Sequence, residues 1–345
     1  MKKILIVGAG FTGAVIARQL AEAGYVVDII EKRDHIAGNA YDYQYANDDG
    51  NIRVHKYGPH LFHTNNVRVF EYLSKYTNWV SYKHKVKALL EDGRFATLPV
   101  NKETKDMVGE ENVLNIFFRP YSLKMWGMEL EELNPEIINR VPIRDDMNEF
   151  YFPNDKYQVL PDNGYTSLVH NIISHQNIRL SLNSQFNKSM EDRYHHIFNS
   201  MPIDEYYNSS HGELPYRSIK FDTKCFFKTK IAMPTATVNF TDDEKFTRVT
   251  EWSQLPNHGE NSFYTVCTYE EPCDYKDNNL ERYYPVKDVY GNNRKIYNKY
   301  KAIINDKVTF VGRCGTYSYL DMHQAVNMAL QVSEKFINEN MSPRR

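Results

Sequence analysis

Paired cysteines and long hydrophobic runs are both missing from this sequence of 345 residues. The cysteines, which show no Cys-x-x-Cys spacing, are Cys225, Cys267, Cys273 and Cys314. We therefore expect reduced thiols in a cytoplasmic protein, and no metal site. No apolar run approaches the roughly 20 residues that a membrane-spanning helix needs. Because an apolar strand is predicted to begin at residue 3, we also expect no signal peptide.

A strong charge of either sign is also absent, because 42 basic residues are balanced by 44 acidic ones and the formal net charge is −2. This balance excludes a broad basic field of the kind that binds nucleic acid or acidic lipid. An anionic ligand would have to be bound by a few placed arginines. Aromatic residues, in contrast, are plentiful, and 26 of them are tyrosines. Composition alone favours half-buried interfaces over a cleft that stacks sugars and bases.

The N-terminus carries the most informative local pattern of the chain. Residues 3–7 form a continuous apolar run, which is typical of a buried parallel strand. The sequence Gly-Ala-Gly-Phe-Thr-Gly follows at 8–13, and residues 14–23 place apolar side chains near helical spacing. Residues 25–30 predict a second strand, which ends at Glu31.

The glycines and the acidic residue of this unit each have a physical role in binding a dinucleotide. Gly8 permits a tight turn, Gly10 lets the backbone approach a pyrophosphate, and Gly13 lets the helix pack close to the strand. The helix N-terminus offers free N–H groups and a partial positive charge to phosphates. Glu31 can accept hydrogen bonds from ribose hydroxyls. The residues of the turn that we assign to the cofactor site are Gly8, Gly10, Phe11, Thr12 and Gly13.

Two further segments favour FAD over NAD. Residues 31–39 resemble the extension of FAD proteins in the amine-oxidase-like superfamily, where the chain turns back to the cofactor through a Gly-Gly pair. Ala37 replaces the first glycine of that pair, which we expect to be tolerated only if its φ is negative. A late strand at 308–312, a loop and a helix from Met322 match the second flavin-contacting segment. The cofactor contacts expected in the first segment are Glu31, Lys32, Gly38 and Asn39.

The predicted fold is an α/β protein with a discontinuous Rossmann-like FAD-binding domain. A small helical domain and an antiparallel β-sheet domain are inserted into it. Alternating stretches such as residues 235–240 indicate the antiparallel sheet. The predicted boundaries are 1–75, 164–203 and 295–340 for the FAD-binding domain, 102–140 for the helical substrate domain, and 76–101, 141–163 and 204–294 for the sheet domain.

Short motifs rich in arginine, tyrosine and histidine are spread over the rest of the chain, without the paired cysteines or the proton-abstracting base usual in a redox enzyme. In number and order they resemble the prokaryotic UDP-galactopyranose mutase family over nearly the whole length. The motifs are GPHLFHT at 58–64, FFRPYSLKMWG at 117–127, NRVPIR at 139–144, FYF at 150–152, GYT at 164–166, YRS at 216–218, FTR at 246–248, YYP at 283–285 and GRCGTYSYLDMH at 312–323.

Four features depart from the family pattern. The helical segment at 102–140 is shorter than in many members, and Met125 replaces the glutamine before the motif's tryptophan. Ser122 stands where threonine is usual, and Trp252 replaces a common histidine. The first and last of these bear on oligomeric state and substrate fit, and none touches the predicted flavin site.

The resemblance implies a reaction without net redox, which interconverts UDP-galactopyranose and UDP-galactofuranose for cell-surface polysaccharide synthesis. N5 of reduced FAD is the implied nucleophile. It attacks the anomeric carbon and displaces UDP, and the 4-hydroxyl then closes the five-membered ring. This mechanism would explain why no protein nucleophile is visible in the sequence. The resemblance also implies a nucleotide-sugar substrate and a homodimer, with no nucleic-acid partner and no membrane span.

By the same resemblance, arginines reach the diphosphate, histidines lie beside the isoalloxazine ring, and aromatic side chains hold the base and the sugar. The implied catalytic residues are Arg140, Arg248, His60 and His63. The implied substrate-binding residues are Phe118, Tyr121, Ser122, Trp126, Tyr151, Tyr284 and Tyr319. The implied cofactor contacts beyond the N-terminal unit are His60, Arg313, Tyr319, Asp321 and Met322.

Simpler interpretations stay open for several of these residues. Asp321 could be a plain helix N-cap, Trp126 could pack in a core, and His63 could be structural. For the function, the alternatives are a mutase for another nucleotide sugar (UDP-N-acetylgalactosamine or a dTDP-6-deoxyhexose), an FAD amine oxidase-like oxidoreductase, and a non-catalytic sensor. Oxygen uptake with amines would identify an oxidase, and turnover would exclude a sensor.

Overall fold

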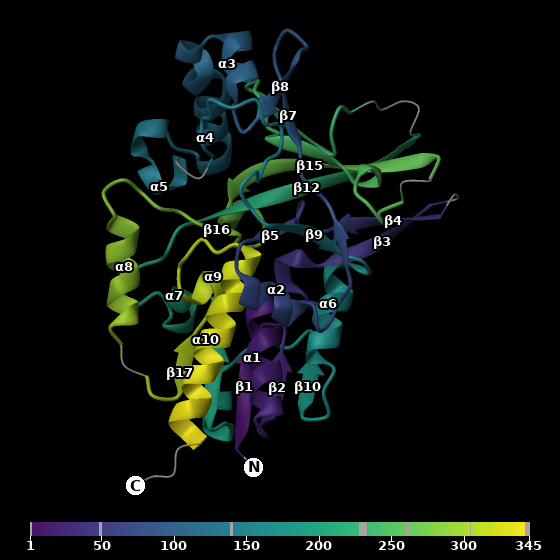
Figure 1. Cartoon of the computed structure of the whole chain (residues 1–345). Helices are drawn as coiled ribbons and strands as arrows, with labels where there is room; N and C mark the ends of the chain where they lie inside the picture. Colours follow the sequence, from purple (N-terminus) through teal and green to yellow (C-terminus); the bar gives the residue numbers. More distant parts are fainter. Residues whose placement is uncertain are drawn as a thin grey trace.

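The computed structural model describes residues 2–47, 50–138, 141–227, 233–259, 262–303 and 305–341. In Figure 1 a parallel sheet with its helices occupies the lower half of the view, long strands cross the upper half, and a small group of helices lies above them. Parallel and antiparallel sheets are therefore combined with helices in one chain. This arrangement confirms the predicted α/β class.

The parallel sheet has the strand order β10-β2-β1-β11-β17. Its strands are β1 (Lys3–Val7), β2 (Val26–Ile30), β10 (Ile178–Ser181), β11 (His196–Asn199) and β17 (Val308–Phe310). The helices α1 (Phe11–Glu22) and α10 (Met322–Met341) pack against each other over this sheet (Figure 1). Leu5, in the central strand β1, is fully buried and lies between Asp28 and Ile197. A strand covered on both faces must be apolar throughout, which explains the run at 3–7.

A second sheet of seven strands has the order β16-β12-β15-β14-β13-β7-β8. Its strands are β7 (Val86–Leu89), β8 (Phe95–Leu98), β12 (Tyr216–Phe227), β13 (Thr237–Phe240), β14 (Arg248–Glu251), β15 (Tyr264–Asp274) and β16 (Tyr284–Pro285). Among these pairs β13 and β7 run parallel, and the others run antiparallel. The predicted antiparallel sheet is thus mixed at one junction, where strands far apart in the sequence meet.

Two smaller sheets join the large ones. The hairpin of β3 (Asp42–Asn47) and β4 (Gly50–His55) leads into a three-stranded sheet ordered β5-β9-β6. The strands of that sheet are β5 (Phe62–Thr64), β6 (Trp79–Ser81) and β9 (Tyr157–Pro161). It combines strands from both sides of the predicted boundary at residue 75, and the division into three domains stays a prediction.

The segment predicted as helical consists mostly of short helices in its described part. It contains α3 (Lys102–Val108), a π-helical turn (Leu114–Phe118), α4 (Arg119–Trp126) and α5 (Pro135–Ile138). Residues 139 and 140 lie outside the described residues. The Asn101 side chain caps α3 by accepting the N–H of Thr104 at 3.0 Å. Gly127, with φ +64°, ends α4 in the left-handed conformation that glycine tolerates.

The remaining helices connect these parts. They are α2 (Val67–Leu73), α6 (Gly164–Ile173), α7 (Ile203–Tyr206), α8 (Asn292–Lys301) and α9 (Gly312–Gly315). Within the described ranges, none of the helices has the length and apolar character needed to cross a membrane.

Candidate active site

The glycine-rich turn brings β1 and α1 very close together. Gly8 has a φ of +102°, and its N–H donates to the carbonyl of Ile30 at 2.8 Å. A Cβ on Gly13 would lie 2.0 Å from the carbonyl oxygen of Gly8, so only glycine permits this approach. A Cβ on Gly10 would lie 3.7 Å from Cα of Gly38. The turn is therefore a surface free of side chains at a helix N-terminus, which fits the pyrophosphate of a dinucleotide.

Glu31 follows β2 directly and its carboxylate bonds back to this turn. Its Oε2 accepts the N–H of Ala9 at 2.8 Å, and its Oε1 accepts the N–H of Arg33 at 3.0 Å. Each oxygen keeps a second lone pair, so the carboxylate can still accept hydrogen bonds from ribose hydroxyls. Phe11 and Thr12 open α1 beside it, and both are buried.

The conformation of Ala37 corrects one expectation. Its φ is +70°, although we expected the substitution of glycine by alanine to be tolerated only with a negative φ. The Ala37 N–H donates to the carbonyl of Ala9 at 2.9 Å, and the residue is 2% exposed. These contacts hold a left-handed alanine despite a cost of about 1–2 kcal/mol. Ala37 thus adopts the left-handed backbone conformation that a glycine at this position would adopt, and the turn beside Gly38 is kept.

The two other cofactor candidates of this segment contact a distant loop. The Asn39 side-chain oxygen accepts a hydrogen bond from Arg33 Nη1 at 3.0 Å, and Lys32 Nζ lies 3.7 Å from a carboxylate oxygen of Glu281. Arg33 also forms an ion pair with Glu281 and places its guanidinium carbon 4.5 Å from the ring centroid of Tyr57. Ion pairs of Lys32 and Arg33 with Glu281 therefore hold the loop around residue 281 against the segment that follows β2.

Arg313 organises the C-terminal side of the site. It donates to the backbone carbonyls of Tyr283 at 2.9 Å and Leu320 at 2.6 Å. Its guanidinium lies 5.1 Å and 5.0 Å from the rings of Tyr284 and Tyr319, which stack on each other with centroids 5.2 Å apart. A fixed cation thus holds two of the predicted substrate-binding tyrosines together.

Arg248, at the start of β14, is charged and partly buried. Its Nε lies 2.8 Å from Oε1 of Glu270 on the neighbouring strand, and the side chains are 29% and 2% exposed. Burial disfavours the charge, but Glu270 outweighs it and raises the pKa of Arg248 above its ordinary value. Tyr121 and Tyr284 lie close enough to Arg248 to raise its pKa further. Burial also raises the pKa of Tyr284 to about 12, so this hydroxyl stays a donor at neutral pH.

The other aromatic candidates line the helical segment above this arginine. Tyr121 interacts electrostatically with Arg248, Tyr284 and Tyr151, and it keeps 37% of its surface exposed. The Trp126 ring lies 6.3 Å from that of Tyr284. Because Trp126 is also 7% exposed and packs in a hydrophobic cluster, the core-packing interpretation fits as well. Phe118 closes the π-helical turn, and both it and Tyr151 pack against the cluster around Val86.

Ser122, an implied substrate-binding residue, is buried within the helical segment. Its side chain is 2% exposed, and its hydroxyl donates to the carbonyl of Met128 at 2.7 Å. The hydroxyl proton is therefore used inside the helical segment, and the role of Ser122 in substrate binding stays a prediction.

His60 presents a defined ring tautomer. Its Nδ1 lies 2.9 Å from the carbonyl of Gly58, so Nδ1 carries the proton and Nε2 is an acceptor. Burial, opposed by this hydrogen bond and assisted by the charges of Arg313 and Arg248, lowers the pKa of His60 to about 4. His60 is therefore neutral at physiological pH and lies among the predicted site residues.

His63 is oriented by an acidic residue that the sequence reasoning missed. Its Nδ1 lies 2.6 Å from Oδ2 of Asp155, and its ring stacks on Phe152 with centroids 3.5 Å apart. The His323 ring lies 5.9 Å away in an edge-to-face arrangement. Asp155 and His323 also line an open hollow of about 510 Å³ beside α10. These partners fit a structural role as well as a catalytic one.

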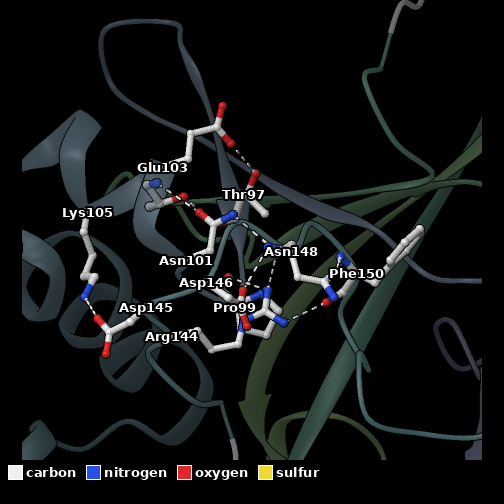
Figure 2. A network of polar contacts seen from close by, with 11 residues as sticks. Thr97, Pro99, Asn101, Glu103, Lys105, Arg144, Asp145, Asp146, Asn148 and Phe150 are labelled. Carbon is white, nitrogen blue, oxygen red and sulfur yellow. Dashed lines mark hydrogen bonds and ion pairs between the residues drawn. The ribbon is translucent and has the colours of Figure 1, made fainter.

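A polar network anchors the segment that leads to Tyr151. Figure 2 shows Arg144 donating to the carbonyls of Asn148 and Phe150, at 2.6 Å and 3.1 Å, while Asn101 donates to the same Asn148 carbonyl at 3.3 Å. The network fixes residues 144–150 against the start of α3. Arg140, the other predicted diphosphate ligand, lies outside the described residues.

Asp321 occupies the N-cap position of α10. Its N–H donates to Oε1 of Gln324 at 2.9 Å, and its carbonyl accepts the N–H of Ala325 at 2.9 Å. This geometry fits the N-cap interpretation. Met322 begins the helix and packs against the main hydrophobic core. Their roles as cofactor contacts stay predictions.

Three functional partners were not found from the sequence. Glu270 lies in a strand beside Glu271, and nothing in that pattern tells which carboxylate is buried. Asp155 follows the motif at 150–152 closely, but its pairing with His63 needs the β5–β9 contact. Glu281 lies in a loop that no motif marks, although the acidic side chain could have suggested a partner for Arg33.

Comparisons with known proteins identify the family to which the chain is similar. The family model of UDP-galactopyranose mutase matches residues 116–319, and that of an NAD(P)-binding Rossmann-like domain matches residues 6–76. A probable UDP-galactopyranose mutase from Klebsiella pneumoniae is 34% identical over 98% of this chain and 95% of that protein. A dTDP-fucopyranose mutase from Escherichia coli is 33% identical over 99% of this chain and 100% of that protein.

Solved structures show the same fold. A crystal structure of reduced UDP-galactopyranose mutase has a TM-score of 0.77 at 16% identity, and covers 99% of this chain and 97% of that one. A putrescine oxidase has a TM-score of 0.58 at 12% identity, and covers 98% of this chain and 99% of that one. These structural matches show the fold alone, whereas the family model and the similar sequences show the family. The chain belongs to the UDP-galactopyranose mutase family.

Proposed function

We propose that this chain is an FAD-dependent mutase that interconverts UDP-galactopyranose and UDP-galactofuranose. The observation that carries the proposal is Arg248, a permanent cation beside the buried Glu270 and close to Tyr121 and Tyr284. A diphosphate leaving group needs a fixed positive charge and several hydroxyl donors. The family membership supports the same assignment, since relatives are named for this reaction.

Reduced FAD, when bound, would supply the nucleophile for the anomeric carbon of the sugar. The chain's own residues would bind the cofactor and the substrate, orient them, and shield the reacting atoms from water. Gly8, Gly10 and Glu31 would hold the dinucleotide, because the turn is free of side chains and the carboxylate has acceptors left. Arg248 would stabilise the charge that grows on the departing diphosphate. His60 would offer its Nε2 lone pair to a donor beside the flavin.

Three tyrosines would hold the substrate in position for this step. Tyr284 and Tyr319 are stacked over Arg313, so their hydroxyls are fixed relative to the diphosphate site. Tyr151 is held by its backbone N–H, which donates to the carbonyl of His84 at 2.8 Å. Placing the reacting atoms in one geometry is itself a large part of catalysis.

One experiment tests the proposal. The purified protein is analysed for released flavin, reduced with dithionite, and incubated with a panel of nucleotide sugars that chromatography resolves into pyranose and furanose forms. We expect bound FAD, and furanose product from UDP-galactopyranose only in the reduced state. Release of NAD without flavin would overturn the cofactor assignment. Equal turnover by oxidised and reduced protein would overturn the flavin mechanism.

A dTDP-6-deoxyhexose is the second candidate substrate. The relative named dTDP-fucopyranose mutase is 33% identical over 99% of this chain, which nearly equals the 34% of the Klebsiella protein. Including dTDP-fucopyranose in the panel separates the two substrates by their kcat/KM. An amine such as putrescine, with oxygen uptake as the readout, tests the oxidase alternative. A homodimer stays a prediction, which analytical ultracentrifugation would test.

A further inference from the structure

Two buried histidines contact each other behind the predicted site. Nε2 of His55, at the end of β4, lies 3.1 Å from Nε2 of His258, and each residue is 1% exposed. The proposed function gives neither residue a role. Two imidazoles this close must share one proton between the facing nitrogens, because two N–H groups or two lone pairs would repel.

The surrounding hydrogen bonds determine where each proton lies. The backbone N–H of His60 donates to Nδ1 of His55 at 3.1 Å, so His55 carries its proton on Nε2. That proton is donated to Nε2 of His258. His258 must then carry its own proton on Nδ1, which lies 2.8 Å from the carbonyl of Pro256. Every ring nitrogen has one role, and both histidines are neutral.

The described groups that pack around His55 disfavour an extra proton on its ring. Arg53 lies near His55 and disfavours a second positive charge. Trp252 and Tyr165 cover the His55 ring at 4.9 Å and 5.5 Å between centroids. The Trp252 N–H donates elsewhere, to the hydroxyl of Thr268 at 2.8 Å. The chain of hydrogen bonds therefore runs in one direction, from His60 to Pro256.

This chain of hydrogen bonds begins at the backbone N–H of His60, in the turn that follows β4. The same turn contains Gly58, which accepts the His60 ring proton, and a Cβ on Gly58 would lie 2.9 Å from the carboxylate of Glu270. Glu270 in turn holds Arg248. A shift of the backbone between residues 55 and 60 would therefore move the His60 ring and change the contact between Gly58 and the carboxylate that pairs with Arg248.

We propose that His55 and His258 are positioning residues: they form a neutral histidine relay that fixes the backbone of His60, so that His60 Nε2 faces the site as a hydrogen-bond acceptor. The relay is assigned from contacts within the chain. What His60 accepts from, a hydrogen-bond donor of the bound flavin or a sugar hydroxyl, rests on the proposed function.

The test compares two substitutions of one residue. His258→Phe fills the space but removes the acceptor for His55, whereas His258→Gln can still accept through its side-chain oxygen. His196→Gln is the matched control, because His196 is also a buried histidine, which bonds Thr309 at 2.8 Å in the parallel sheet. Ring-nitrogen NMR shifts, amide exchange at His60 and the flavin absorption spectrum are measured for all of them.

In the unsubstituted protein we expect His55 protonated on Nε2 alone and His258 on Nδ1 alone. In His258→Phe we expect about tenfold faster amide exchange at His60, the effect of weakening one hydrogen bond, together with a shifted flavin spectrum. His258→Gln should restore both, and His196→Gln should change neither while lowering stability. We also expect kcat to fall in His258→Phe, to recover in His258→Gln and to stay unchanged in His196→Gln, with KM nearly constant in all three variants.

Doubly protonated His55 at neutral pH would overturn the relay, even if no variant folds. So would a His258→Gln protein that behaves like His258→Phe, or a His258→Phe protein with unaltered exchange and spectrum. The NMR and exchange measurements need no nucleotide sugar. Failure of the mutase assignment would therefore leave them interpretable, and failure of the relay would leave the panel experiment unaffected.

Discussion

The guanidinium of Arg248 is held in place by the buried carboxylate of Glu270. The first prediction concerns this arginine. Arg248→Ala should cost about 2–4 kcal/mol of transition-state stabilisation, because a charge-assisted donor to a developing anion is lost. The loss should appear in kcat as well as in KM, measured by steady-state kinetics with reduced enzyme. Flavin content should not change, and Arg248→Lys should recover part of the loss. A variant that loses only flavin would place the arginine in the cofactor site instead.

Ala37 is a second residue whose local conformation makes a prediction. Its φ of +70° is unfavourable for alanine and ordinary for glycine. Ala37→Gly should raise the free energy of unfolding by about 0.5–1 kcal/mol, the left-handed strain relieved minus the entropy that glycine adds to the unfolded chain. Urea unfolding of the flavin-free protein measures this difference. Ala40→Gly, nearby and with no such strain, should destabilise, and equal changes for the two variants would contradict the argument.

At the scale of elements, the π-helical turn and α4 carry the predicted base-binding side chains. Phe118→Ala should weaken UDP binding by about 1–3 kcal/mol, since stacking on the base is lost, and should leave the flavin spectrum unchanged. Quenching of tryptophan fluorescence by UDP, with Trp126 as the expected reporter, gives the affinity. Leu123→Ala is the control, because Leu123 lies on α4 and is 47% exposed.

The base itself is tested by competition in the same assay. Ser122 is buried, so the choice between uracil and thymine must come from edge contacts of other residues or from the room at the pyrimidine C5 position. We expect UDP to bind more tightly than dTDP. Competition by dTDP at equal or lower concentration would make the dTDP-sugar the leading substrate.

How far the elements could be predicted depends on how local their causes are. Apolar patterning and three glycines predict the strand at 3–7 and the helix at 14–23, and the structure confirms both, although the helix begins three residues earlier, at Phe11. The parallel contact of β13 with β7 joins residues about 150 positions apart, and no local pattern contains it. Likewise, Glu270 differs from Glu271 only in which face of β15 it occupies, which the pleat decides after the sheet has formed.

At the scale of the whole molecule, neutral histidines with lowered pKa values couple stability to pH. Burial lowers the pKa of His84 to about 3, and that of His60 and His196 to about 4. Their folded-state values lie below the ordinary value of about 6.5, so the unfolded chain binds more protons below that pH. The stability from these groups is complete above pH 6.5 and falls as the pH decreases toward 4.

We therefore expect the free energy of unfolding to decrease between pH 6.5 and 5 by up to about 1.4 kcal/mol per pH unit for each such histidine. Urea unfolding of the flavin-free protein at several pH values measures the slope. His196→Gln should reduce that slope by about one proton without affecting the site. A flat profile across this interval would show that these histidines are not held neutral in the folded chain.

The order of strands in the parallel sheet has a consequence for the synthesis of the protein. β1 is made first, but its neighbour β11 ends at residue 199, and β17 begins at residue 308. Gly312 follows this last strand. A Cβ added to Gly312 would lie about 3.4–3.9 Å from side-chain atoms of Ser200 and Thr12, so Gly312 packs beside both residues. Domains generally fold as units while the ribosome adds about 5–20 residues per second. A nascent chain that has not yet reached residue 308 therefore holds the glycine turn but lacks β17, the edge strand of the parallel sheet, and the glycine that packs beside the turn.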